Sequence, residues 1–304
     1  MHKTWRPWAQ AVVLIVAGGF LIALVVRQWS ALQAYRWRLA PEWALLALIG
    51  LELTWLFELD AWRMILRGLG APLAYRTAAP IWFLSNIVRY IPGNIWQFLG
   101  MAELAHEAGA PRLTTLTSII LHQAISTAAG VAFAAAYFAL FDDGEWLRYL
   151  RPALLIAPLG LLLLQPRLLE GALNWLLRRL GRPAIRVSLT GRQIVLLVGR
   201  YLGVWTMMGL SFAALTRGLA PLDWPAAAYL VAAWAAAYVI GYLTLLTPAG
   251  LGVREGALVL FLLPIMPAGA AAVVAIVARL WMVVGEALGA GAALIVRGQS
   301  WRRE

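Results

Sequence analysis

Long apolar runs separated by short polar breaks dominate the chain and predict membrane-spanning helices. A crossing needs about 20 mainly apolar residues. Uncharged or weakly charged runs of that length lie at residues 7–26, 43–66, 113–141, 193–216, 224–246 and 271–296, with a shorter one at 152–166. The pattern predicts an all-α integral membrane protein with about seven or eight transmembrane helices. We expect a multi-pass protein of the plasma membrane.

Two apolar segments are interrupted by proline and glycine. The first break contains Pro92 and Gly93, and the second contains Pro248, Gly250 and Gly252. Proline lacks an amide donor and glycine adopts left-handed turns, so a helix breaks at such positions. A break at membrane depth persists only where protein or a water-filled cavity satisfies the backbone. We therefore expect two re-entrant segments.

The two breaks belong to a candidate internal repeat. The residues Pro92, Gly100 and Pro111 recur as Pro248, Gly256 and Pro267, each 156 positions later. Interrupted segments in matching positions of two halves point to a transporter's midplane site. The alternative is coincidence, because the chain has 27 glycines and 15 prolines. We expect one transmembrane domain over residues 1–304, with repeat halves at about 43–141 and 193–296 linked by the segment 166–192.

Charge and composition restrict the classes of molecule that the protein could bind. The chain is 62% hydrophobic and 13% charged, with a net charge of +11. Six arginines crowd the amphipathic segment 166–192, which marks it as cytoplasmic. Arginines that border apolar spans favour anionic lipid headgroups over nucleic acid. With no cysteine and only three histidines, the sequence predicts no metal site and no cofactor.

Charged and polar residues beside the breaks or within the spans are the candidate site. Arginine suits phosphate because its planar fork donates two parallel hydrogen bonds and stays charged. The predicted substrate-binding residues are Arg89, Asn94, Gln97, Arg254 and Arg279. The predicted charge-balancing or proton-coupling residues are Glu52, Glu255 and Glu286. The alternative is that these side chains only neutralise one another and brace the bundle.

Three local expectations concern single residues. Asp60 and Arg63 are spaced three apart on a helix and should form an interfacial salt bridge. His122 lies inside an apolar span, where a neutral ring bonded to a neighbouring backbone carbonyl is expected. The helix that follows Pro92 should end at Gly109, with glycine as its C-terminal cap.

Both breaks resemble motifs of one family. Residues 89–96 read RYIPGNIW and residues 248–256 read PAGLGVREG. They are similar to two elements of the transmembrane, flippase-like region of lysylphosphatidylglycerol synthase/flippase proteins and their stand-alone relatives. Ala249 departs from the family's usual glycine. The resemblance covers nearly the whole chain, without the soluble aminoacyl-transfer domain of the two-domain members. It implies lipid translocation and no lipid synthesis.

Two functions remain open from the sequence. The first is a flippase or transporter for an anionic phospholipid or a polyprenyl-phosphate-linked lipid. The second is an integral membrane enzyme, or an accessory subunit, of polyprenyl-linked glycan or lipid assembly. No catalytic motif appears, and Glu170 is the one carboxylate in the Arg-rich cytoplasmic segment. No catalytic residue is predicted. Positive-inside counting leaves the C-terminal side, and hence the number of crossings, undecided.

Overall fold

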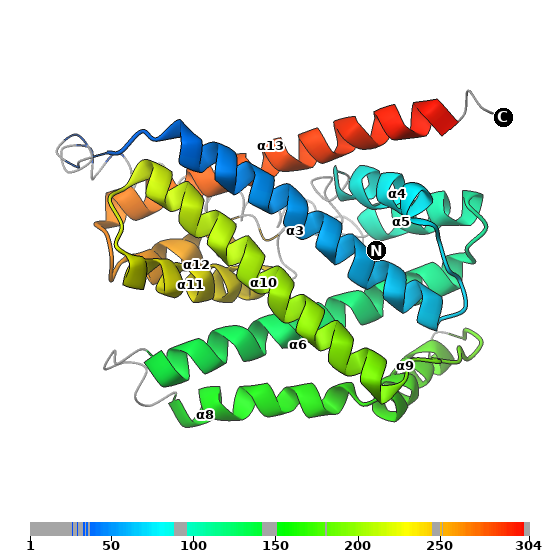
Figure 1. Cartoon of the computed structure of the whole chain (residues 1–304). Helices are drawn as coiled ribbons and strands as arrows, with labels where there is room; N and C mark the ends of the chain where they lie inside the picture. Colours follow the sequence, from blue (N-terminus) through cyan, green and yellow to red (C-terminus); the bar gives the residue numbers. More distant parts are fainter. Residues whose placement is uncertain are drawn as a thin grey trace, which may run out of the picture. The chain divides into compact units, whose positions relative to one another are not determined.

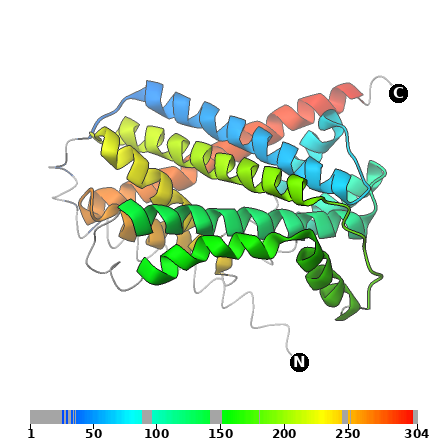
Figure 2. The same ribbon diagram turned by 60° about the horizontal axis from the view of Figure 1, so that its bottom comes forward.

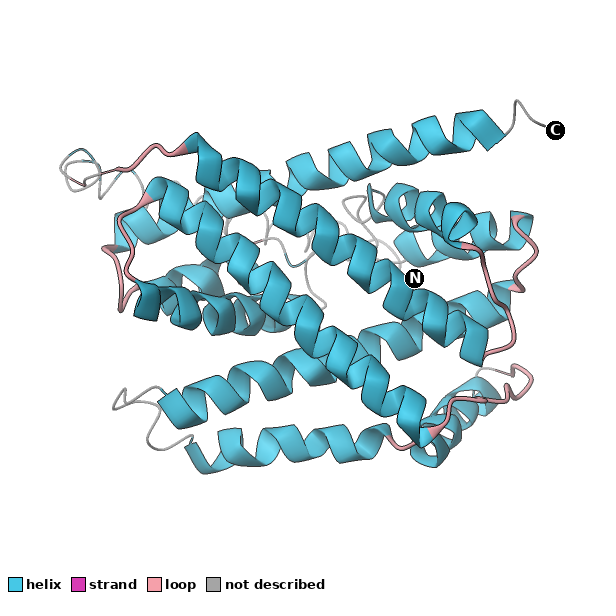
Figure 3. Cartoon of the chain, viewed as in Figure 1, coloured by secondary structure: helices cyan, strands magenta, loops and turns pink. Residues whose placement is uncertain are grey.

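Helices and short connections make up the part of the chain that the structure describes, and no strand occurs in that part (Figure 3). A computed structural model describes residues 37–87, 96–141, 151–179, 181–244, 250 and 252–300, together with isolated positions 26, 29, 33 and 35. The all-α prediction is confirmed. The predicted first span at 7–26 lies outside the described residues, except for position 26.

Figure 1 shows the helices coloured in chain order. In chain order they are α3 (Pro41–Gly68), α4 (Tyr75–Ile87), α5 (Trp96–Glu107), α6 (Arg112–Phe141), α8 (Arg151–Ile156), the 3₁₀ helix η2 (Ala157–Leu164), α9 (Pro166–Arg179), α10 (Gly191–Leu219), α11 (Trp224–Leu243), α12 (Val253–Leu262) and α13 (Ala268–Ser300).

Four of these helices are long and apolar enough to cross a membrane. They are α6, α10, the Ala226–Leu243 part of α11, and the Ala268–Ile295 part of α13. Each coincides with a span expected from hydropathy, so the multi-pass membrane character is confirmed. The break residues Arg89, Pro92, Gly93, Asn94 and Pro248 lie outside the described residues. The count of seven or eight crossings and the re-entrant segments therefore stay predictions.

Packing divides the chain into two units. Unit 1 takes in Met1–Leu53, Arg89–Trp96 and Thr206–Leu288, and unit 2 takes in Thr54–Val88, Gln97–Trp205 and Gly289–Glu304. Helices α3, α10 and α13 each contribute residues to both units. The single-domain and repeat-half boundaries remain predictions.

Aromatic side chains and close helix contacts form the core of unit 1. Phe212 of α10 stacks on Trp234 of α11 at 4.7 Å between ring centroids. Trp281 of α13 meets the same tryptophan edge-on at 5.7 Å. At Gly209 an added Cβ would lie 2.7 Å from the Cα of Val231, so glycine is what allows α10 and α11 to approach so closely. Aromatic contacts around Trp234 and the close helix approach at Gly209 therefore stabilise unit 1.

Unit 2 is organised around tryptophans that pack on α6. The indole N–H of Trp62 donates to Ser118 Oγ at 2.9 Å, and that of Trp205 donates to the Ser126 carbonyl at 2.8 Å. Helix α6 also contacts α8 and η2, and the two views show them side by side (Figures 1 and 2). The indole donors of Trp62 and Trp205 therefore both have partners on α6 itself.

The end of α5 confirms the predicted glycine cap. Gly109 has a φ of +90°, in the left-handed region that favours glycine. Its N–H donates to the His106 carbonyl at 2.9 Å, and the Ala110 N–H donates to the Ala105 carbonyl at 2.9 Å. Those two bonds define a Schellman motif and satisfy carbonyls that the helix would otherwise leave open.

Candidate functional site

The start of α12 carries the best-defined site in unit 1. Gly250 and Gly252 precede the helix with φ values of +67° and +82°, which explains why the second break needs glycine there. The N–H of Gly252 donates to Glu255 Oε2 at 2.7 Å. Glu255 thereby caps the first turn, where a carboxylate is favoured by the positive end of the helix dipole.

The second carboxylate oxygen of Glu255 faces two arginines. Its Oε1 accepts a hydrogen bond from Arg254 Nη2 at 3.0 Å and lies 3.6 Å from Arg279 Nη1. The side chains are only 5% exposed for Glu255, 7% for Arg254 and 12% for Arg279. We call these three residues the α12 cluster. It is a buried group with one more positive than negative charge.

Neighbouring side chains hold Arg254 in place. Its Nη1 donates to the sulfur of Met282 at 3.1 Å. Its guanidinium lies 5.5 Å from the ring centroid of Tyr238 and 5.7 Å from that of Trp234. Two aromatic faces and a thioether stabilise a buried cation without neutralising it. These contacts pre-organise the guanidinium at the helix start.

Gly241 of α11 makes room for this arginine. An added Cβ at Gly241 would lie 2.6 Å from Arg254 Cβ, and one at Gly250 would lie 2.8 Å from the Gly241 carbonyl oxygen. Glycine at both positions therefore lets the start of α12 approach the end of α11. The sequence pattern indicates Gly250 as a break residue but gives no signal at Gly241, because the contact joins segments that only the fold brings together.

The remaining predicted residues divide between the two units. Glu286, in unit 1, is 3% exposed and lies two turns beyond Arg279 on α13. Glu52 Oε1, on the unit 1 part of α3, is buried with no hydrogen-bond partner among the described residues.

Gln97 belongs to unit 2, where its Nε2 donates to Asn86 Oδ1 at 2.5 Å. Arg89 and Asn94 lie outside the described residues.

A second polar group, in unit 2, surrounds His122. Its Nδ1 lies 2.6 Å from the Tyr201 hydroxyl and its Nε2 lies 3.6 Å from Glu58 Oε1. The Trp82 ring meets the imidazole edge-on at 5.1 Å. The expected bond from this histidine to a backbone carbonyl is therefore wrong, since a tyrosine and a glutamate from distant helices take the two ring nitrogens.

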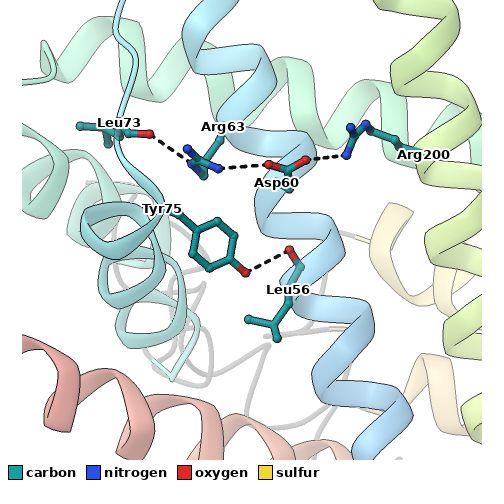
Figure 4. Close-up of polar contacts among 6 residues, drawn as sticks. All are labelled: Leu56, Asp60, Arg63, Leu73, Tyr75 and Arg200. Atoms are coloured by element: carbon teal, nitrogen blue, oxygen red, sulfur yellow. Dashed lines mark hydrogen bonds and ion pairs between the residues drawn. The ribbon is translucent and has the colours of Figure 1, made fainter.

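The predicted pair of Asp60 and Arg63 is confirmed and has a third member. Arg63 Nη1 lies 3.1 Å from Asp60 Oδ1, and Arg200 Nη1 lies 2.5 Å from Asp60 Oδ2 (Figure 4). Arg200 stands 140 residues away in the chain, so no local spacing could have indicated it. Within the described ranges, no group of three or more acidic, histidine or cysteine side chains is placed to hold a metal ion.

Comparison with known protein families gives one match. Residues 9–289 match the family model described as the lysylphosphatidylglycerol synthase TM region. That range contains both sequence motifs, the α12 cluster and the polar groups of unit 2. No curated protein matches the chain.

Proposed function

We propose, from the premise that this chain belongs to the lysylphosphatidylglycerol synthase TM region family, that it moves an anionic lipid across the membrane. The family makes it a membrane protein involved in lipid handling. The proposed cargo is an anionic phospholipid or a polyprenyl-phosphate-linked lipid. Its headgroup would travel through the protein while its tails stay in the bilayer.

The α12 cluster is the observation that carries this proposal. Two buried arginines share one carboxylate at the start of a helix, where the positive end of the helix dipole also favours an anion. A phosphate would accept charge-assisted hydrogen bonds from both guanidinium groups. We assign Arg254 and Arg279 to headgroup binding, with Glu255 keeping the arginines paired when no lipid is bound.

The other predicted site residues receive supporting roles. Arg89 and Asn94 of the first break, and Gln97 just after it, stay proposed donors to a lipid headgroup. Glu52 and Glu286 are carboxylates in apolar helices, and ionisable groups at such depth mark transport or proton pathways. We propose that they balance the arginine charge and that one of them takes up a coupling proton.

We further propose about seven or eight crossings, with both Pro/Gly breaks as re-entrant segments of an internal repeat. The left-handed glycines before α12 support the second re-entrant segment, because they turn the chain at the start of a helix of only ten residues. The plasma membrane is the proposed location.

Translocation in proteoliposomes tests the function. Fluorescent phosphatidylglycerol, its aminoacyl derivative and a short polyprenyl phosphate would each be followed with wild type, Arg279→Ala and Arg89→Ala. Loss of a charge-assisted hydrogen bond to phosphate should slow transport by about ten-fold or more. Arg112→Gln is the matched control, because it removes one arginine from an exposed ion pair with Glu103.

Two outcomes would end the proposal. Wild-type transport rates in well-folded Arg279→Ala and Arg89→Ala protein would remove the site assignment. Failure of wild-type protein to move any of the lipids would favour an accessory subunit, or an enzyme, of polyprenyl-linked assembly.

A further inference from the structure

Two arginines and one aspartate in unit 2 form a separate cationic cluster. Asp60 of α3 bonds Arg63 through Oδ1 and Arg200 of α10 through Oδ2 (Figure 4). The side chains are 14% exposed for Arg63, 39% for Asp60 and 36% for Arg200. We call these three residues the Asp60 cluster. Like the α12 cluster, it has one more positive than negative charge.

The donors of Arg200 are largely unused. Arg63 is held on two sides, because its Nε donates to the Leu73 carbonyl at 3.1 Å and its Nη1 to Asp60. Arg200 donates only through Nη1, and its Nε and Nη2 make no hydrogen bond to any residue that the structure describes. A guanidinium carries five N–H donors in a planar fork. Most of that fork is therefore open to a ligand with two adjacent oxygens.

The cluster lies near one end of the helices that carry it. Arg200 is the tenth residue of α10, so its Cα is about 13 Å from the helix start. A helix of 29 residues is about 43 Å long and exceeds the ~30 Å hydrocarbon core. If α10 is centred in the bilayer, Arg200 sits about 7 Å inside the core boundary, within reach of a snorkelling arginine. Ser188, in the connection just before α10, donates through Oγ to the carbonyl of Gly68, the last residue of α3.

Exposed apolar side chains border the cluster. On α3, Leu56 is 37% and Phe57 41% exposed, and on α10 Val195 is 71% and Leu196 51% exposed. The Arg200 guanidinium lies 5.7 Å from the Phe57 ring centroid. In a membrane these residues face acyl chains. An anion held by Arg200 therefore lies beside a surface suited to lipid tails, which a free ion does not use.

We infer that the Asp60 cluster is a binding site for the phosphodiester headgroup of an anionic membrane lipid. Arg200 holds the phosphate oxygens through its open fork. Asp60 orients Arg200 through Nη1, and its negative charge repels a phosphate held on the open edge of the guanidinium. The residues of this site belong to unit 2 and those of the α12 cluster to unit 1. The inference does not depend on translocation, since binding alone defines the site.

Direct binding measurements on purified full-length protein test the inference. Short-chain phosphatidylglycerol, the matching neutral diacylglycerol and inorganic phosphate are titrated separately, with calorimetry as the readout. Arg200→Gln should weaken phosphatidylglycerol binding about ten-fold, which is one charge-assisted bond. Arg112→Gln, which removes an exposed paired arginine, should leave it unchanged.

The substitution Asp60→Asn distinguishes a lipid-binding site from an ion pair with a purely structural role. Removing the carboxylate frees both arginines, so phosphatidylglycerol binding should tighten even though the resting protein loses two ion pairs. Equal affinity in wild type and folded Arg200→Gln overturns the site. Weaker binding in folded Asp60→Asn overturns the assignment of Asp60 as a charge that opposes the phosphate. Inorganic phosphate binding as tightly as the lipid, or diacylglycerol binding that also depends on Arg200, overturns the lipid-headgroup assignment.

Discussion

Glu255 is the residue on which the α12 cluster depends, because one carboxylate serves a helix cap and two arginines. Replacing Glu255 by Gln keeps an oxygen for the Gly252 N–H but removes the carboxylate charge that two buried guanidinium groups share. Breaking a buried ion pair in this way costs about 3–5 kcal/mol. We expect a clear fall in the melting temperature of the detergent-solubilised protein.

The matched control is Glu103→Gln, which breaks an ion pair whose two side chains are each 53% exposed. An exposed pair contributes little, so this variant should melt close to wild type. Equal melting temperatures for Glu255→Gln and Glu103→Gln would show that the α12 cluster is hydrated rather than buried.

The exposed pair gives a pH prediction of its own. Two hydrogen bonds from Arg112, each 2.7 Å long, hold the pKa of Glu103 below its ordinary value of 4.5. A carboxyl group whose pKa is lowered on folding stabilises the protein above its unfolded pKa, and that contribution disappears as pH falls through the folded pKa. The small melting difference between wild type and Glu103→Gln should thus be present at neutral pH and vanish below the lowered pKa. A difference that grows on acidification would contradict the assignment.

At the residue scale, the sequence predicts interactions within one helix better than it predicts contacts between residues of different helices. The Asp60–Arg63 pair and the Gly109 cap follow from spacing on one helix, and both are confirmed. Tyr201 lies 79 positions from His122, and Arg200 lies 140 positions from Asp60. Such pairings depend on how helices pack, which no local pattern contains.

At the element scale, the close approach of α11 and α12 decides where Arg254 lies. Gly241→Ala would place a Cβ 2.6 Å from Arg254 Cβ and 3.1 Å from its Cα, so the two helices must separate. Overpacking of this kind costs about 1–3 kcal/mol. We expect lower thermal stability and, under the proposed function, slower lipid transport.

Gly199→Ala is the control for this substitution. Gly199 lies on α10 with nothing within 4 Å of an added Cβ. Alanine is about 1 kcal/mol better than glycine in a helix interior, so this variant should melt at or above the wild-type temperature. A loss of stability in both variants would show that the methyl group at position 241 has no specific effect.

Helix limits follow hydropathy closely where the apolar run is long. The expected spans 113–141 and 193–216 became α6 (Arg112–Phe141) and α10 (Gly191–Leu219). The expected short span 152–166 instead divides into α8 and the 3₁₀ helix η2, with Pro158 at the start of η2. Apolar composition therefore predicts that a segment is helical. Whether it forms an α-helix or a 3₁₀ helix depends on where proline lies and, for α8 and η2, on packing against α6.

At the scale of the whole molecule, the distribution of arginines should determine which helix ends face the cytoplasm. The arginines of α9 and of the following connection favour the cytoplasm. Because the native chain has no cysteine, single cysteines can report sidedness without a background. Arg182→Cys and Pro221→Cys are both exposed and flank α10. A membrane-impermeant maleimide should label position 182 from the cytoplasmic side and position 221 from the opposite side.

A third cysteine, added after Glu304, counts the crossings. If the second broken segment returns to the side from which it entered, α13 carries the end of the chain away from the cytoplasm and the total is seven. Because we propose that this segment is re-entrant, we expect labelling on the side opposite to position 182 and seven crossings. Arg297, Arg302 and Arg303 favour the cytoplasm and argue for the other outcome. Labelling on the same side as position 182 would show that the second broken segment crosses the membrane fully, which makes the total eight.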